Sequence, residues 1–157
     1  MRLNYAQQSA PIFEKLRDLS LASKKSSLEK EIKHLVDLRV SQINGCAFCV
    51  DMHVKEARID GERELRLHHV AVWRESPLFN DRERAALEWA ELLTKLPPHG
   101  VSDADFQAAR KVFSESELSD LTFAIITINS WNRLSIGFAA EPGSADKFYH
   151  LDRANLN

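Results

Sequence analysis

The chain contains few of the residues and patterns that would break helices or build a β-sheet. Five glycines and five prolines in 157 residues leave long stretches without a helix-breaking residue. No run alternates apolar and polar residues over more than a few positions, and the Asn-Gly pair at 44–45 lies between two helical patterns, not between two strand patterns. We therefore expect an all-α fold.

Signals for secretion or for a membrane span are also missing. Residues 1–13 have no apolar core of the kind found in a secretory signal. The longest apolar stretch, at 121–131, is too short and too interrupted to cross a bilayer. We expect a cytoplasmic protein that does not enter a membrane.

The chain has no excess of charge of either sign. Lys and Arg number 21 and Asp and Glu number 23, which gives a formal net charge of −2. This balance provides no electrostatic attraction for nucleic acid or for an anionic membrane, so we expect neither as a partner. The length predicts a single domain that spans residues 1–157.

Capping residues and helix breakers divide the chain into a series of expected helices. Pro11 lies near the start of the first helix, and Ser26 with Glu29 has the spacing of a capping box. Gly45 and Gly61 each follow a helical pattern, as helix-terminating glycines do. The expected helices are 9–22, 26–43, 46–61, 62–74, 80–96, 102–113 and 114–140, with further capping boxes at Asn80/Glu83, Ser102/Asp105 and Ser114/Glu117.

The last expected helix is apolar nearly all round between Leu121 and Ile136. Such a helix is either central in its domain or buried against another subunit. Asn129, Asn132 and Arg133 interrupt the apolar pattern. If they are buried they need hydrogen-bond partners, so we expect a structural role for them.

Cys46 and Cys49 are the only cysteines in the chain, and His53 follows them closely. Spacings of three, four and seven residues place all three side chains on one face of a helix. The helix start favours negative charge and should lower a cysteine pKa, and a histidine one turn away can take or hold a proton. In a reducing compartment such a pair is more often redox-active, catalytic or metal-binding than a permanent disulfide.

Several interpretations of this stretch stay open from the residues alone. A thioredoxin-type redox motif needs a βαβ setting, which the chain lacks. A zinc site needs four ligands, of which Cys46, Cys49 and His53 supply three. A buried, inert pair of thiols is a further alternative. His34 lies on the preceding helix and could reach the cysteines across a helical hairpin, with Glu31 orienting its ring, or could be an ordinary core histidine.

Other polar and aromatic residues receive no chemical role. Adjacent helical residues point about 100° apart, so His68 and His69 are expected to form a surface pair. Trp73 and Trp131 could line a substrate pocket, but at helical spacing they are expected in the core. Asp51 and Glu56 are expected to be solvated or to lie in an interface, and Arg39 could pair with either of them.

Residues 28–61 resemble the core of the AhpD-like alkylhydroperoxidases of the carboxymuconolactone decarboxylase family. The features that carry the resemblance are "LRVSQINGC", the Cys-X-X-Cys pair, the histidine four residues after the second cysteine and the glycine that closes the helix. Residues 73–94 and "INSWNRL" at 128–134 are similar to peroxidase-like members of the same family. The resemblance thus extends from about residue 28 to residue 136.

The resemblance implies an all-helical fold in which a helical hairpin carries the Cys-X-X-Cys helix, and it implies reduction of hydroperoxides by a dithiol. By this likeness Cys49 is the peroxidatic cysteine, Cys46 resolves it as a disulfide, and His53 belongs to a proton relay. The closeness of His53 to Cys49 favours the same assignment, although the helix dipole favours Cys46. No bound cofactor is implied. The implied partners are a hydroperoxide substrate, an unidentified dithiol electron donor and further copies of the chain in a trimer or hexamer.

The chain departs from the family pattern at His34, because similar proteins carry a glutamate there. A neutral imidazole could replace that carboxylate in the relay. The family's other named chemistry, lactone decarboxylation, does not need two cysteines, so their presence argues against it. The alternative function is a non-catalytic oligomeric helical protein that uses Cys46, Cys49 and His53 to bind zinc or a small ligand.

Overall fold

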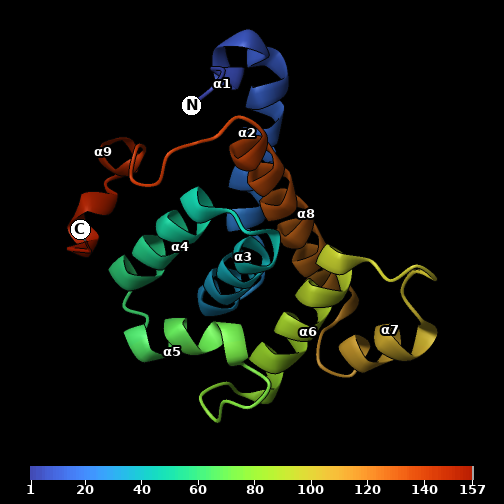
Figure 1. Ribbon diagram of the computed structural model, residues 1–157. Helices are drawn as coiled ribbons and strands as arrows, with labels where there is room; N and C mark the ends of the chain where they lie inside the picture. The colour runs from blue at the N-terminus through green and yellow to red at the C-terminus, as the bar shows by residue number, and fades with distance from the viewer. Residues whose placement is uncertain (157) are drawn as a thin grey trace.

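Two antiparallel helices, α3 (Lys30–Asn44) and α4 (Ala47–Ile59), form the hairpin that carries the two cysteines. The structure is a computed structural model that describes residues 1–156 (Figure 1). Helix α3 packs against α4, α6 and α8, which makes it the central element of the fold. The expected hairpin with the Cys-X-X-Cys helix as its second arm is confirmed.

The remaining elements surround this hairpin, and the described residues contain no strand, which confirms the all-α expectation. Helices α6 and α8 pack on α3 and on each other, and α2 lies along α8. Near the C-terminus, η2 packs against α4. The bounds are α1 (Tyr5–Gln8), α2 (Ala10–Lys24), α5 (Glu64–His69), η1 (Val70–Val72), α6 (Asp81–Lys95), α7 (Asp103–Arg110), α8 (Glu115–Gly137), α9 (Asp146–Tyr149) and η2 (Leu151–Ala154).

Three of the predicted capping boxes are present and fix the starts of α6, α7 and α8. In each one the N-cap side chain accepts a hydrogen bond from the N–H three residues later. The carboxylate of that later residue accepts one from the N-cap N–H. The pairs are Asn80 with Glu83, Ser102 with Asp105 and Ser114 with Glu117.

The predicted capping box at Ser26 is wrong. Helix α3 begins at Lys30, with Glu29 as its N-cap residue. The N–H and hydroxyl of Ser27 both donate to Asp120 of α8, at 3.1 and 2.8 Å. These two hydrogen bonds hold the segment around Ser27, just before α3, in a non-helical conformation. The helix expected at 62–74 is also divided, into α5 and the short η1.

Helix α3 contributes to two hydrophobic clusters on opposite sides. Ile32, Val36 and Val40 pack with residues of α6, α7 and α8, including Leu121, and with Phe113 between α7 and α8. A second cluster on the other side of α3 joins it to α4, α5, η1 and α6, and its α3 members are Leu35 and Leu38. The hairpin is therefore held from both sides by apolar burial.

Helix α8 buries only one face within a single chain. Leu121, Ile125 and Ile128 are buried, whereas Phe123 and Ile126 are each about half exposed. Helix α2 has no buried residue, although it lies against α8. Exposed apolar side chains thus remain on both helices. Within residues 1–156, no helix is long and apolar enough to cross a membrane.

Candidate active site

The turn between the two hairpin helices sets the position of the first cysteine. Gly45 has a φ of 69°, a left-handed conformation that favours glycine. Its N–H donates to the carbonyl of Gln42, and the N–H of Cys46 donates to the carbonyl of Ser41 at 3.0 Å. These two bonds form a Schellman motif, which ends α3 and reverses the chain into α4.

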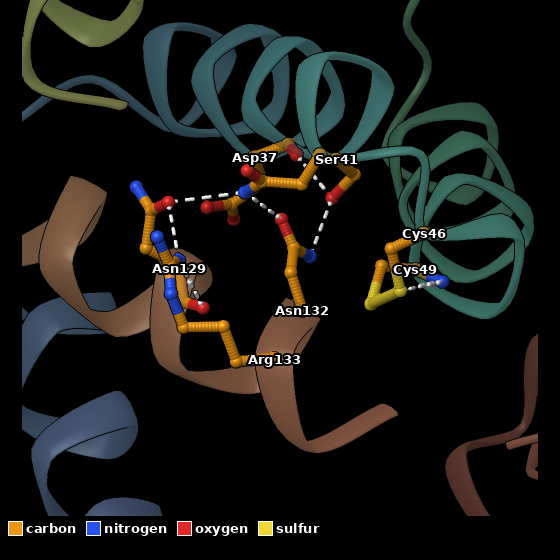
Figure 2. Close-up of a disulfide and its surroundings, with 8 residues drawn as sticks. Asp37, Ser41, Cys46, Cys49, Asn129, Asn132 and Arg133 are labelled. Carbon is orange, nitrogen blue, oxygen red and sulfur yellow. Dashed lines mark hydrogen bonds between the residues drawn. A yellow bond between two sulfur atoms is a disulfide. The ribbon is translucent and has the colours of Figure 1, made fainter. Parts of the chain in front are cut away.

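Cys46 and Cys49 lie together at the start of α4 and are joined as a disulfide, with their Cα atoms 5.3 Å apart (Figure 2). Cys46 is the N-cap residue, and its Sγ accepts a hydrogen bond from the N–H of Cys49 at 3.3 Å. Both side chains are buried, at 1% and 2% exposure. In the reduced state this N–H would stabilise a thiolate on Cys46.

A chain of side-chain hydrogen bonds ties this turn to α8. Asn44 donates to Asn129 at 3.0 Å and to Asn132 at 2.8 Å, and Asn132 donates to the hydroxyl of Ser41 at 3.1 Å (Figure 2). Arg133 in turn donates to the Asn129 side chain. Asn132 is fully buried, so its two bonds satisfy groups that would otherwise be costly to bury. These three α8 residues have the structural hydrogen-bonding role expected from the sequence.

His53 is buried one turn beyond Cys49 and is held by Glu56. The Nδ1 atom of His53 lies 2.9 Å from Oε2 of Glu56, whose Oε1 accepts a hydrogen bond from Lys24 at 3.1 Å. Burial raises the pKa of Glu56, but the bonds and charges of His53 and Lys24 outweigh it and lower that pKa to about 2. Glu56 is therefore ionised at neutral pH and can only accept, so Nδ1 of His53 carries a hydrogen.

The charges around His53 favour its protonated form. Burial lowers the pKa of His53, but the negative charges of Asp37 and Glu56 and the hydrogen bond to Glu56 raise it above its ordinary value. An imidazolium on the face of α4 that holds Cys49 favours a thiolate there and can give a proton to a leaving group. The sequence alone left open whether His53 takes a proton or gives one. This environment fits the role of proton donor better than that of base.

His34 does not lie beside the cysteines, contrary to the sequence-based expectation. Its Nε2 is 2.8 Å from Oδ2 of Asp60, which also binds Lys30 at 2.6 Å. Asp60 follows Cys49 by eleven residues, which is about 16 Å along a helix. The antiparallel hairpin carries a residue twelve positions before Cys46 to the far end of α4. Asp60, not Glu31, orients the His34 ring.

Two expectations about charged residues of the hairpin are wrong. Arg39 does not pair with Asp51 or Glu56 but with Glu91 of α6, at 2.6 Å. Glu56 is neither a solvated charge nor an interface charge but the hydrogen-bond partner of His53. Its position three residues after His53 on one helix is a sequence signal for such a pair. Asp51 accepts hydrogen bonds from Lys55 and from the N–H of Gly143, so it anchors the C-terminal segment to α4.

The remaining sequence candidates have structural positions. Trp73 is buried in the core, as expected, and donates to Glu91. Trp131 packs edge-on against Phe13 of α2. His68 is exposed, whereas His69 bonds Ser76. Across residues 1–156 no group of three His, Cys, Asp or Glu side chains is arranged to hold a metal ion.

The family can be assigned from a sequence model and from close relatives. The model described as the carboxymuconolactone decarboxylase family matches residues 8–92. The chain belongs to this family. It is 36% identical over 143 residues to the uncharacterized protein YdfG of Bacillus subtilis (strain 168), covering 91% of this chain and 97% of YdfG.

Solved structures of the family share the fold. A protein of unknown function from Agrobacterium tumefaciens, with the provisional name of antioxidant defence protein AhpD, is 45% identical with a TM-score of 0.86. That likeness covers 90% of this chain and 97% of the other. A debrominase has the same fold at 17% identity, with a TM-score of 0.78 over 94% of this chain and 79% of its own. The fold is thus AhpD-like, and it also occurs in a debrominase.

Proposed function

We propose that this protein is a cysteine-dependent peroxidase that reduces hydroperoxides through a Cys46–Cys49 dithiol and disulfide cycle. The observation that carries the proposal is the pairing of two bonded sulfurs at a helix start with a buried histidine one turn away that is hydrogen-bonded to Glu56. Family membership and the AhpD-like relative support it. The chemistry needs no bound cofactor, because both electrons come from the two thiols.

In the first step the thiolate of Cys49 attacks the terminal oxygen of the hydroperoxide. A sulfur–oxygen bond forms and the oxygen–oxygen bond breaks, so Cys49 becomes a sulfenic acid and an alkoxide or hydroxide leaves. The leaving oxygen needs one proton, and His53 in its charged form supplies it. The products of this step are an alcohol or water and the oxidised Cys49.

In the second step the Cys46 thiolate attacks the sulfur of the sulfenic acid. The disulfide forms and hydroxide leaves, to be protonated to water. An external dithiol donor then reduces the disulfide and completes the cycle. The Cα separation of 5.3 Å allows the bond to form without movement of the backbone.

The two cysteines differ in a way that suits this division of roles. Cys49 is one turn from His53, so a leaving group at Cys49 is close to the proton that it needs. The Sγ of Cys46 accepts the N–H of Cys49, which stabilises the thiolate that must attack in the second step. The same stabilisation makes Cys46 a good leaving group when a donor dithiol attacks Cys49.

We also propose that the protein acts as a homo-oligomer, a trimer or hexamer, in the cytoplasm. The exposed apolar side chains of α8 and α2 support self-association, because contact with another copy would remove them from water. They are Ile12, Leu21, Phe123, Ile126 and Ile136. Sedimentation of the purified protein tests this, and a monomer at micromolar concentration would contradict it.

Peroxide consumption tests the proposed activity against zinc or ligand binding. The wild-type protein, supplied with a small dithiol such as dithiothreitol, should consume hydrogen peroxide or an organic hydroperoxide over many turnovers. A variant in which both cysteines are serine should show only the background rate. Stoichiometric zinc in the purified wild-type protein, together with no peroxide consumption, would reject the peroxidase in favour of the metal-binding alternative.

A further inference from the structure

One side chain of α8 holds the last turn of α3 at two points. The amide of Asn132 uses both of its polar atoms: Oδ1 accepts a hydrogen bond from Asn44 at 2.8 Å, and Nδ2 donates to the hydroxyl of Ser41 at 3.1 Å. Ser41 and Asn44 are three residues apart, so they lie on one face of α3. Figure 2 shows Asn132 reaching from α8 to Ser41, with the disulfide beside them. The amide therefore holds the turn that immediately precedes Cys46.

Ser41 connects this contact to the first cysteine. Its carbonyl accepts a hydrogen bond from the N–H of Cys46 at 3.0 Å. Its hydroxyl accepts from Asn132 and donates to the carbonyl of Asp37 at 2.7 Å. Ser41 and Asn132 are both fully buried, so water does not compete for these bonds. The position of the Cys46 backbone thus depends, through Ser41, on a side chain of α8.

The two cysteines need this contact to different degrees. Cys49 lies inside the first turn of α4, so the helix itself fixes its direction relative to His53. Cys46 is the N-cap residue, and its φ of −86° and ψ of 93° are not helical. Its Sγ is therefore placed by the turn that leads into the helix. When the disulfide is reduced, no covalent bond holds Cys46 against Cys49, and the turn has to do so.

The polar character of Asn132 suits this task better than simple packing. An apolar side chain could fill the same space in the interior without the cost of removing an amide from water. A buried amide that makes two hydrogen bonds instead fixes the direction as well as the distance of its partners. The contact of Asn132 with Ser41 and Asn44 is thus a device for geometry.

We propose that Asn132 is a positioning residue for the second step of the cycle, because it keeps the Cys46 thiolate within bonding distance of the sulfenic acid on Cys49. This inference rests on the proposed function. In that step the Cys46 sulfur forms the sulfur–sulfur bond and hydroxide leaves the Cys49 sulfur. Asn132 transfers neither electrons nor protons. The first step uses Cys49 and His53 of one helix and does not depend on Asn132.

The reduction potential of the disulfide tests this inference without any peroxide. Measured on the full chain in thiol redox buffers, Asn132→Ala should weaken disulfide formation about tenfold, which makes the potential about 30 mV less negative. A merely structural role would destabilise the oxidised and reduced forms equally and leave the potential unchanged. Thr127→Ala is the matched control, because Thr127 is a buried polar residue of α8 whose hydroxyl donates to the carbonyl of Phe123 in its own helix. It should lose stability and keep the wild-type potential.

Single-turnover kinetics with hydrogen peroxide separate the two steps. Asn132→Ala should form the sulfenic acid on Cys49 within about twofold of the wild-type rate and should form the disulfide about tenfold more slowly. The sulfenic acid should therefore accumulate and be labelled by dimedone. Ser41→Ala keeps the carbonyl that binds Cys46 and should show a smaller change in the same direction. The Ser41→Ala/Asn132→Ala double variant should not exceed Asn132→Ala, since both residues act through one contact.

The outcomes separate the inference from the proposed function. An unchanged potential in Asn132→Ala, or an equal shift in Thr127→Ala, would overturn the assignment of Asn132. A shifted potential with a wild-type rate of disulfide formation would overturn its role in the second step. A shifted potential with no peroxide reduction by the wild-type protein would support the hold of Asn132 on Cys46 and reject the peroxidase.

A second variant covers the case in which Asn132→Ala does not fold. Asn44→Ala removes the other hydrogen bond of the Asn132 amide at a partly exposed position. A less negative potential in Asn44→Ala would support the inference, and an unchanged one would reject it.

Discussion

The two ends of the α3–α4 hairpin both contain a histidine bound to a carboxylate that also binds a lysine, but only one of the two pairs lies near the cysteines. At the far end His34 binds Asp60, next to Lys30, and these residues line a small surface hollow of about 100 Å³. Towards the end that carries the cysteines, His53 binds Glu56, and both cysteines are buried. An imidazole–carboxylate pair alone therefore does not identify a site.

The difference lies in what surrounds each pair. The His53 ring is buried on the same face of α4 as the thiols, so its protonated form would act on a sulfur with little screening by water. The His34 pair has no thiol near it, although its carboxylate binds an exposed lysine just as Glu56 does. The predictions below test whether the chemistry belongs to the His53 end alone.

The largest effect is expected from the replacement of Cys49. Cys49→Ser should lower peroxide consumption by more than about a thousandfold, because the attacking sulfur is lost. The helical circular dichroism and the melting temperature of the reduced protein should change little. If this variant keeps its activity and Cys46→Ser loses it, the roles of the two cysteines are reversed.

Cys46→Ser should separate the two halves of the cycle. The first half needs only Cys49 and His53, so this variant should consume one equivalent of peroxide and then stop. A sulfenic acid should accumulate on Cys49, and mass spectrometry after labelling with dimedone would detect it. Sustained turnover at the wild-type rate would show that Cys46 is not needed for resolution.

Glu56→Gln should lower the rate of peroxide reduction about tenfold at neutral pH. This is less than the roughly 10²- to 10⁴-fold effect of losing a general acid, because the ring of His53 remains. Without the negative charge the pKa of His53 falls, so the imidazolium is lost at a lower pH. The alkaline limb of the pH–rate profile should move in the same direction. An unmoved profile would contradict the role of Glu56.

The same variant has a defined effect on the dependence of stability on pH. The pKa of Glu56 is lowered in the folded state, from 4.5 to about 2. The ionised side chain therefore contributes stability above pH 4.5, and this contribution is lost as the pH falls towards 2. The free energy of unfolding of Glu56→Gln should depend less on pH across this window than that of the wild type. Denaturant unfolding at several pH values measures the difference.

The sequence predicts contacts within one helix better than contacts between two helices. The Cys46, Cys49 and His53 face follows from spacing within one helix, as do the three capping boxes. The partners of Arg39 and His34 depend on the register between helices, which single-helix periodicity does not specify. Asp37 was missed for the same reason. Its charge acts on His53 because α3 and α4 pack against each other.

The smallest effect is expected at the far end of the hairpin. His34→Ala should change the rate of thiolate attack by less than about twofold, since His34 is bound to Asp60 and not to the cysteine face. Stability should fall by about 1 kcal/mol or less, as is usual for an ion pair with solvent access. Stopped-flow measurement of the first peroxide turnover would reveal any larger effect. A tenfold loss would return His34 to the proton relay that the family resemblance suggests.

A thiol titration of the reduced protein before and after one equivalent of peroxide tests the central claim most directly. Two free thiols should be present per chain before the addition and none after it. The mass should then fall by two hydrogens, and a peptide containing the Cys46–Cys49 bond should be recoverable. Two thiols that persist in the presence of peroxide would contradict the proposal that this pair is a redox centre.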